Sequence, residues 1–268
     1  MHMAGAALDP WGSSENLRAM MLNYSLAADS GELVERPGVS LVNSGIAFSA
    51  FNAALLTGAS LEHPRELRAC LQHAQRYFHA KRLPWSFWMA EERVSPQVRQ
   101  SASIAVNAAG LRWIAQHEGM MADRLSAPVR ALPAIEVRRV FDRATRGHFA
   151  RLSSTVFNLP QPVSSSVYGQ PDFWSGTLAG WVGYWEGHPV CCAATQSAAG
   201  VIGLYSVATH PGFRGRGFAE SITRHALEKA RQASGLHVSI LHATREGQPL
   251  YRQLGFRYAT RLDVYVTA

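Results

Sequence analysis

Cysteine is scarce in this chain, which argues against a disulfide framework or a thiolate metal site. Only Cys70, Cys191 and Cys192 occur among 268 residues. An odd number with two adjacent members matches neither paired disulfides nor the ligand spacing of a zinc site. We expect three buried thiols in a reducing compartment, no metal and no cysteine nucleophile.

Long apolar runs and repeats are missing as well. No stretch approaches the roughly 18 consecutive apolar residues of a membrane span. The N-terminus also lacks the basic-then-apolar pattern of a signal peptide. Low-complexity tracts and internal repeats are not visible in the sequence. These absences predict a cytoplasmic location and no membrane partner.

Runs of basic residues are absent too, although the net charge is +7. The charge is uneven, because residues 1–132 carry a net +1 and residues 133–268 a net +6. With neither a Lys/Arg run nor a nucleic-acid motif, we expect no nucleic-acid partner. A small polyanionic ligand would explain the excess equally well.

Length and composition slightly favour two domains. A hydrophobic fraction of 47% is enough for one large core or two modest ones. The stretch 126–133 contains two prolines and is the best candidate boundary. We therefore predict an N-terminal domain over 1–132 and a C-terminal domain over 133–268.

The N-terminal half shows helical and extended patterns but no chemical motif. Its aromatic cluster Trp85, Phe87 and Trp88 could line a ligand pocket, although such clusters more often belong to a core. The predicted elements are a helix within 16–27, an extended segment at 38–55, a helix of roughly 18 residues from His63, a strand at 83–89 and a helix from Ser95 to about Gly110.

The C-terminal half alternates regularly in the order β-α-β-β-β-α-β-α-β, which predicts a mixed α/β fold. Asp142 is expected to cap a helix and Gly235 to end one. The predicted strands are 134–140, 177–186, 189–194, 201–209, 236–243 and, as one or two strands, 256–267; the predicted helices are 142–157, 215–231 and 248–254.

A glycine-rich turn between the strand at 201–209 and the following helix is the most informative segment. Gly215 and Gly217 allow a ligand to approach the backbone closely. The first helix amides lack internal partners, and with Arg214 and Arg216 they form an anion site suited to phosphate. A tight turn without a ligand is one alternative. A dinucleotide-binding loop fits poorly, because the turn follows three antiparallel-looking strands.

Two motifs in this half resemble the GNAT superfamily of N-acetyltransferases. Arg214-x-x-Gly217-x-Ala219 resembles the coenzyme-A signature Gln/Arg-x-x-Gly-x-Gly/Ala of that family, and residues 250–256 resemble its Leu-Tyr-x-x-x-Gly-Phe segment. With the strand order, the resemblance covers about residues 134–268. It implies a GNAT fold there, and the N-terminal half could be a degenerate GNAT-like copy in a tandem arrangement. An independent helical lid is the alternative.

The resemblance also implies an acetyl-CoA site and direct acetyl transfer to an amine, without an acyl-enzyme. The backbone of residues 207–209 would pair with the pantetheine arm and polarise the thioester carbonyl. Tyr251 would protonate the departing thiolate, although a core tyrosine is the alternative. Thr244 stands where many relatives have an asparagine that contacts the cofactor. The implied cofactor-binding residues are Val207, Ala208, Thr209, Arg214, Gly215, Arg216, Gly217, Phe218, Ala219, Glu220 and Thr244.

The general base is left open by the sequence. Ser239 stands where some relatives have a catalytic glutamate. His242 lies on the face shared by Val238 and Ile240, and an ordinary histidine pKa of about 6.5 would suit the task. A structural histidine and a water chain are the alternatives, whereas Glu186 and His188 flank a hairpin turn.

The leading interpretation is therefore an enzyme that acetylates a small-molecule or peptide amine. A non-catalytic acyl-CoA-binding regulatory module on the same fold is the alternative, because a fold does not determine a function. The acceptor stays open. So does the oligomeric state, with which a homodimer is compatible.

Overall fold

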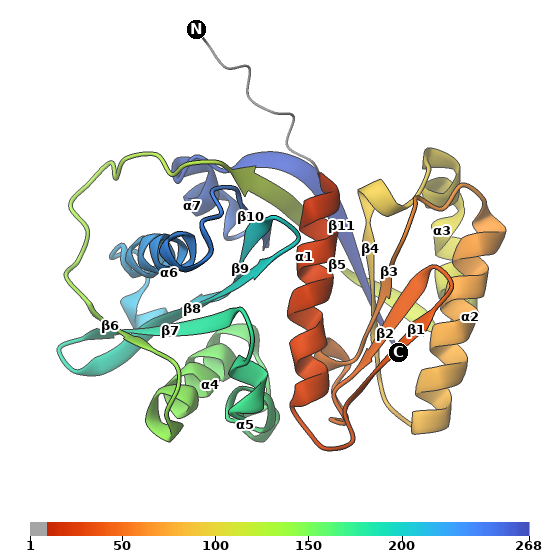
Figure 1. Ribbon diagram of the computed structural model, residues 1–268, viewed down its shortest axis with the longest axis horizontal. Coiled ribbons are helices and arrows are strands. Elements are labelled where there is room, and N and C mark those ends of the chain that lie inside the picture. The colour runs from red at the N-terminus through yellow and green to blue at the C-terminus, as the bar shows by residue number, and fades with distance from the viewer. Residues whose placement is uncertain (1–9, 268) are drawn as a thin grey trace, which may run out of the picture.

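A single mixed sheet runs through the computed structural model, which describes residues 10–267 (Figure 1). In this range its eleven strands lie in the order β1-β2-β3-β4-β11-β5-β10-β9-β8-β7-β6. The strands are β1 (Glu32–Arg36), β2 (Val39–Asn43), β3 (Ala53–Leu56), β4 (Ser86–Ala90), β5 (Leu111–Ala122), β6 (Glu136–Arg139), β7 (Leu178–Trp185), β8 (His188–Ala198), β9 (Val201–Thr209), β10 (Ser239–Ala243) and β11 (Arg257–Thr267). The α-helices are α1 (Pro10–Leu22), α2 (Pro64–Lys81), α3 (Pro96–Ala108), α4 (Arg143–Phe157), α5 (Gln161–Tyr168), α6 (Phe218–Ser234) and α7 (Gln248–Gln253). The predicted mixed α/β fold is confirmed.

The two halves of the chain repeat one topology. In the N-terminal half, β1, β2 and β3 are antiparallel neighbours, α2 leads to the parallel strand β4, and α3 leads to β5. In the C-terminal half, β7, β8 and β9 are antiparallel, α6 leads to the parallel strand β10, and α7 leads to β11. The N-terminal half is therefore not an independent helical lid, since its strands continue the same sheet.

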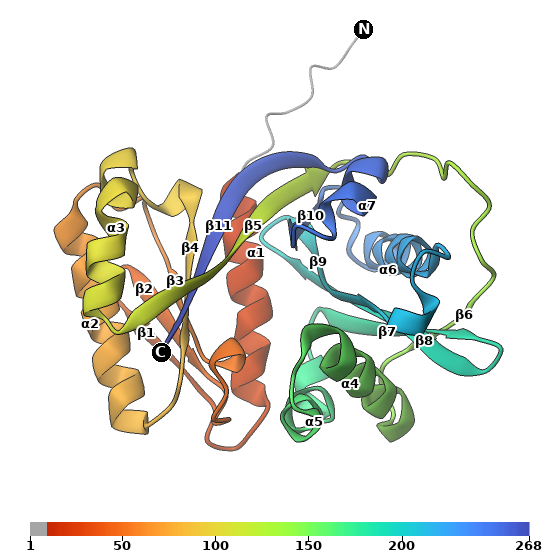
Figure 2. The same ribbon diagram turned by 180° about the vertical axis from the view of Figure 1, so that it is seen from behind.

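The last strand of each half lies beside the other half. β5 pairs with β10 and β11, and β11 in turn pairs with β4. Figure 2 shows β5 and β11 side by side where they bridge the two halves. The predicted boundary at 126–133 falls in the irregular connection between β5 and β6. The division at residue 132 stays a prediction, because the exchanged strands join both halves in one sheet.

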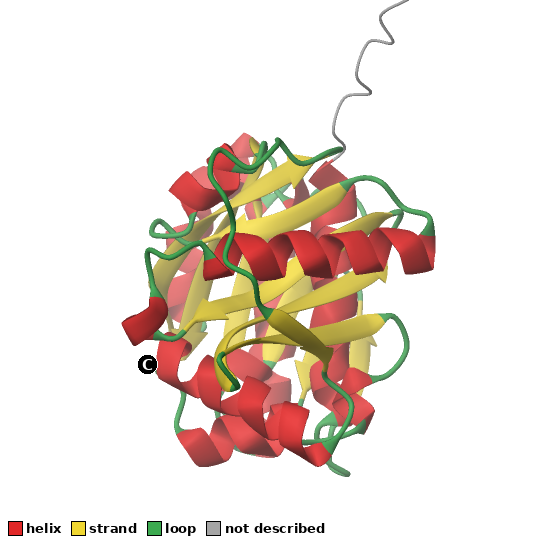
Figure 3. Ribbon diagram, turned by 90° about the vertical axis from the view of Figure 1, so that its left-hand side faces the viewer, coloured by secondary structure: helices red, strands yellow, loops and turns green. Residues whose placement is uncertain are grey.

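Helices cover both faces of the sheet (Figure 3). One apolar cluster joins α1, α4 and α5 to strands of both halves. On the other face, α2 and α3 pack on the N-terminal strands, and α6 packs on β8, β9 and β10. The first cluster matters for the site, because it brings α1 of the N-terminal half over the C-terminal strands.

Most predicted elements are confirmed, and the differences are local. Strand β5 and helix α5 were not predicted, because β5 lacks a clean two-residue alternation and α5 is short and serine-rich. The strand predicted at 83–89 begins only at Ser86, and the helix predicted from 215 begins at Phe218. The final segment is one strand with two register shifts.

All three cysteines are buried free thiols, as the sequence predicts. Burial raises the pKa of Cys70 to about 11 and that of Cys191 to about 12. Such thiols hold few thiolates at neutral pH, which makes them poor nucleophiles. In the described part of the chain, no three His, Cys, Asp or Glu residues are grouped as metal ligands. Of the helices described, none combines the length and apolar character needed to span a membrane.

Candidate functional site

Two neighbouring strands of the C-terminal half diverge. β9 and β10 pair only from Ile202 to Leu204 on the β9 side. Beyond that point β9 continues to Thr209 and β10 to Ala243 without pairing to each other. The edge of β9 that faces β10 over residues 205–209 is therefore open to an extended ligand, which could pair with it as an added strand.

A β-bulge lies where the strands diverge. Ser206 and Val207 of β9 together oppose one residue of β8, Ala193. Ser206 has a φ of 51°, in the left-handed region, which costs a non-glycine residue about 1–3 kcal/mol. Strain of this kind concentrates at functional sites. Residues 207–209 were expected at the site from the sequence, but Ser206 was not, because a serine carries no signal for positive φ.

The turn before α6 leaves the N-terminus of this helix uncapped. Gly217 is the N-cap residue with a φ of 89°, and no side chain bonds to the first helix amides. A Cβ at Gly217 would lie 3.1 Å from Cδ of Pro133. Glycine is therefore required here by both conformation and space, and the free amides face a cavity of about 240 Å³.

Most of the predicted turn residues lie around this smaller cavity. The carboxylate of Glu220 is buried and accepts a hydrogen bond from Arg224 at 2.7 Å, which keeps it paired. Arg216 lines neither this cavity nor the larger one described below, because its guanidinium lies over the ring of Phe213 at 5.5 Å. Ala208 is buried in the core instead. The predicted residues that line the smaller cavity are Thr209, Arg214, Gly215, Gly217, Phe218, Ala219 and Glu220.

Two further polar groups at the smaller cavity could contact a bound ligand. Arg130, from the connection between β5 and β6, donates a hydrogen bond to the carbonyl of Gly215 at 3.4 Å and lines the cavity. Arg130 could not be assigned to this site from the sequence, because 85 residues separate it from Gly215. Thr209 Oγ1 is buried without a hydrogen-bond partner among residues 10–267. Buried hydroxyls are normally satisfied, so a bound ligand would supply the missing partner.

A larger cavity of about 410 Å³ lies on the other side of the diverging strands, between α1 and the sheet. Four residues predicted for the site line it, namely Val207, His242, Thr244 and Tyr251. The structure thus brings together residues from β9, β10 and α7 that the sequence connected only by resemblance. The predicted site is divided between the two cavities, with β9 running from one to the other.

His242 lies in the larger cavity with one ring nitrogen unsatisfied. Its Nε2 is 3.1 Å from Ser13 Oγ of α1, whereas its Nδ1 is buried without a partner in the described structure. Burial, and then the nearby His117, lower the pKa of His242 to about 3. The imidazole is therefore neutral at pH 7, so that it can accept a hydrogen bond but is a weak base.

A second histidine, His117 of β5, lines the same cavity. Its ring stacks on that of Trp88 with centroids 6.2 Å apart, and its Nδ1 is also buried without a described partner. Burial lowers the pKa of His117 too. His117 could not be assigned to the site from the sequence, because it belongs to a strand of the N-terminal half that pairs with β10. Of the aromatic cluster considered as a pocket lining, Trp88 lines this cavity, whereas Trp85 and Phe87 are buried in the hydrophobic core.

Tyr251 reaches the larger cavity from α7. Its ring packs edge-on against Phe256 at 5.9 Å, and its hydroxyl makes no hydrogen bond within residues 10–267. Burial raises the pKa of Tyr251. The phenol therefore keeps its proton at neutral pH and has it free to donate.

The other residues considered as bases lie away from the cavity. Ser239 is at the start of β10, where its Oγ accepts a hydrogen bond from Arg231 at 3.2 Å. Glu186 and His188 are exposed in the turn between β7 and β8. Ser239, Glu186 and His188 therefore do not line the larger cavity.

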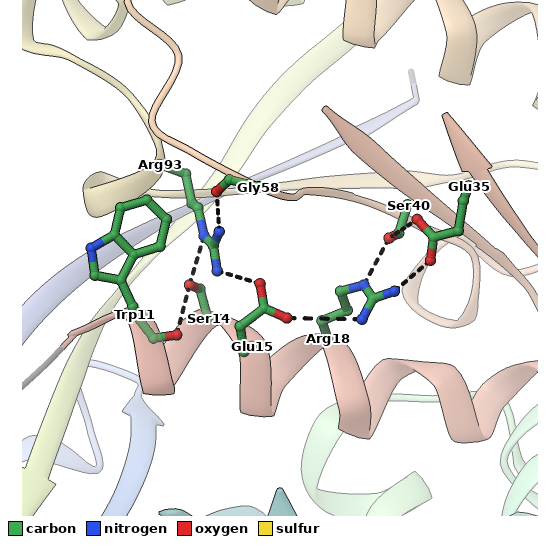
Figure 4. Close-up of polar contacts among 8 residues, drawn as sticks. All are labelled: Trp11, Ser14, Glu15, Arg18, Glu35, Ser40, Gly58 and Arg93. Carbon is green, nitrogen blue, oxygen red and sulfur yellow. Dashed lines mark hydrogen bonds and ion pairs between the residues drawn. The ribbon is translucent and has the colours of Figure 1, made fainter. Parts of the chain in front are cut away.

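The corresponding strand–helix junction of the N-terminal half is closed. Leu61 forms a parallel bridge to Val94, which joins the segments that follow β3 and β4. Arg93 is buried there and bonds to Gly58 O at 2.5 Å and to Glu15 at 2.5 Å (Figure 4). The Arg93 guanidinium also lies over the Trp11 ring of α1 at 4.3 Å. These contacts close the position of the N-terminal half that is equivalent to the open gap between β9 and β10.

Comparisons with known proteins agree with this geometry. Residues 136–256 match the family described as Acetyltransferase (GNAT) family. Over 99% of this chain and 96% of the other, the fold is similar to that of a GCN5-related N-acetyltransferase from Kribbella flavida (TM-score 0.72, 17% identity). A functionally unknown conserved protein from Staphylococcus epidermidis ATCC 12228 is similar over 90% of this chain and 95% of its own (TM-score 0.63, 12% identity).

A tandem GNAT protein from the clavulanic acid biosynthesis pathway is also similar, over 97% of this chain and 96% of its own (TM-score 0.58, 13% identity). At these identities the likeness concerns the fold. No curated protein sequence matches the chain. The whole-chain coverage supports the tandem arrangement that the repeated topology indicates.

Proposed function

Because residues 136–256 form a domain of the GNAT acetyltransferase family, we propose that the protein transfers an acetyl group from acetyl-CoA to an amine. The observation that carries this proposal is the open edge of β9. It runs from an uncapped helix N-terminus to a cavity that contains a protonated tyrosine. One extended molecule with a phosphate end and a reactive end would fit this arrangement.

The cofactor would lie along β9. Its pantetheine arm would pair with the backbone of residues 207–209, while the bulge at Ser206 would aim an amide at the thioester carbonyl. Its pyrophosphate would bind the amides of 215–220, with charge from Arg214 and Arg130. No metal is required, since these amides and guanidinium groups supply the positive charge.

The reaction we propose is direct. The nitrogen lone pair of a neutral amine attacks the thioester carbonyl carbon, and a C–N bond forms. The tetrahedral intermediate collapses as the C–S bond breaks, and the sulfur leaves with the bonding electrons. Tyr251 gives its proton to this thiolate, and the excess proton on nitrogen passes to His242 or to water. The neutral state of His242 permits this role, while its low basicity favours a water-mediated path.

Acetyl-CoA turnover against a panel of amines tests the proposal. In Tyr251→Phe, kcat should fall by about 100-fold while acetyl-CoA affinity stays unchanged, because only the proton donor is lost. Tyr258→Phe is the matched control, since Tyr258 is exposed and bonds to Glu91 away from the cavity. Equal kcat values in the wild type and Tyr251→Phe would remove Tyr251 from the mechanism.

A non-catalytic acyl-CoA-binding module is the second candidate. It is favoured by one observation: the described lining of the larger cavity contains no carboxylate that could act as a strong base. Tight acetyl-CoA binding without release of free coenzyme A for any amine would select this module over the enzyme.

A further inference from the structure

We infer that the acceptor is a small amine with an uncharged, aromatic or aliphatic body, held in the larger cavity against α1 of the N-terminal half. This inference rests on the proposed function and names the substrate class of the same site. It also assigns a role to the N-terminal half, which carries no chemical motif of its own.

The first support is the origin of the cavity wall. Leu17, Met20, Met21 and Tyr24 come from α1 and the turn that follows it, and all four line the cavity. They belong to the apolar cluster that spans both halves. The acceptor pocket is therefore incomplete without the N-terminal half, whereas the proposed cofactor contacts on β9 and α6 belong to the C-terminal half.

The second support is the complete lack of charge in the lining. Among the described residues, the cavity wall contains no Asp, Glu, Lys or Arg. An isolated ionised group is very costly to bury in apolar surroundings unless it is paired. An amino acid would bring an unpaired carboxylate, and a polyamine or aminoglycoside would bring additional unpaired ammonium groups. The lining therefore selects against all three.

The third support is size and shape. A volume of about 410 Å³ is typical of pockets for small molecules, which are mostly apolar with a few polar groups. Aromatic rings from Phe51, Trp88 and Tyr205 face this space together with Met20 and Met21. Thioether sulfur and aromatic edges both contact aromatic ligands favourably. A compact ring-bearing amine fits this lining better than a peptide.

The same environment prepares the nucleophile. Desolvation disfavours the charged form of any amine, as it does for His242 and His117 in this cavity. A bound primary amine would therefore lose its proton more readily than in water and present the lone pair that the reaction needs. The polar groups that could orient it are the two histidine rings and Ser206.

Three acceptors that differ in the charge they would bring into the cavity test the inference. We would measure kcat/KM for 2-phenylethylamine, for phenylalanine, which adds a carboxylate, and for 1,4-diaminobutane, which replaces the ring with a second ammonium group. We expect 2-phenylethylamine to exceed each of the others by about 100-fold, the equivalent of one unpaired buried charge. A higher kcat/KM for either charged acceptor would overturn the inference.

Binding of the same three amines, measured by calorimetry with coenzyme A present, separates this inference from the proposed function. Preferred binding of 2-phenylethylamine without any turnover would support the acceptor pocket and overturn the enzymatic proposal. Turnover of the charged acceptors alone would support the enzyme and overturn the apolar pocket. Equal affinity for all three amines would also overturn it.

A pair of methionine variants locates the pocket. Met20→Ala enlarges the cavity, so it should raise kcat/KM for 2-(1-naphthyl)ethylamine relative to 2-phenylethylamine by about fivefold. Met89→Ala is the matched control, because Met89 is equally buried but packs in the core of α2 and α3. Both variants lose packing, so a shift confined to Met20→Ala supports the inference, and equal ratios in both overturn it.

Discussion

The two halves of this chain share a topology but differ at one junction. After β9 the strands diverge, the turn carries Gly217 at a φ of 89°, and the amides of α6 are uncapped. After β3 the chain is bridged to the segment after β4, and the backbone amides of Glu62 and His63, just before α2, donate hydrogen bonds to the carboxylate of Glu66. The same fold therefore leaves a helix N-terminus without a side-chain cap in one half and places a carboxylate at the helix N-terminus in the other.

The open junction of the C-terminal half is not needed to build the fold. The N-terminal half keeps its strands, helices and core, so stability does not require the open junction. At its own junction the backbone is paired instead, by the Leu61–Val94 bridge and by the bonds of Arg93 to Gly58 and of Glu66 to His63. The N-terminal half also contributes α1 to the wall of the larger cavity, beside the strands of the other half. A carboxylate at a helix N-terminus would repel a phosphate, so the N-terminal half should bind no cofactor.

The largest expected effect comes from Gly217→Glu. A side chain at this position meets Pro133 and must adopt a positive φ, and its charge opposes the pyrophosphate. We expect acetyl-CoA affinity to fall by at least about 100-fold, measured by calorimetry, while the protein stays folded. Unchanged affinity would remove the phosphate site from α6.

Gly58→Glu is the counterpart in the N-terminal half. Gly58 also has a positive φ, of 73°, but a Cβ there would contact nothing within 4 Å. Acetyl-CoA affinity should stay within about twofold of the wild type, although backbone strain lowers stability slightly. Comparable losses of affinity in the two variants would contradict the contrast between the halves.

A smaller effect is expected from Arg130→Ala. Arg130 is exposed and would contribute one charge-assisted contact to a phosphate, so affinity for acetyl-CoA should fall by about three- to tenfold. The loss should shrink in high salt, because exposed charges are screened. Arg124→Ala, on the same connection but outside the cavity lining, is the control. The same loss in both would indicate only a general charge effect.

The pH dependence of stability tests the burial of His242 in the larger cavity. Since the pKa of His242 is about 3 in the folded protein and near 6.5 when unfolded, the unfolded state binds the extra proton between these values. Its contribution is fully present above pH 6.5 and is lost as the pH falls toward 3. His242→Gln should reduce the slope of unfolding free energy against pH by up to about 1.4 kcal/mol per pH unit. His188→Gln, at an exposed position away from the cavity, is the control substitution.

Much of the fold and part of the site could be predicted from the sequence. Asp142 and Gly235 mark helix ends by local chemistry, and each lies at the helix end that the sequence predicts. His117, Arg130 and the α1 wall could not be predicted. They reach the site only through strand exchange and a long connection, and nothing local in the sequence records such contacts.

The smallest effect concerns the capped helix of the N-terminal half. Glu66 accepts hydrogen bonds from the amides of His63 and Glu62, and these bonds lower its pKa. Its stabilising effect is therefore present above its ordinary pKa of about 4.3 and disappears as the pH falls through the lowered value. Glu66→Ala should lower the melting temperature slightly at pH 7 and not at all at the acidic end, whereas Glu62→Ala keeps both amide bonds. Calorimetry should still give one acetyl-CoA per chain in Glu66→Ala, because the Leu61–Val94 bridge and Arg93 keep the junction closed. A second binding site in this variant would mean that Glu66 alone, and not the closed strands, prevents the N-terminal half from binding acetyl-CoA.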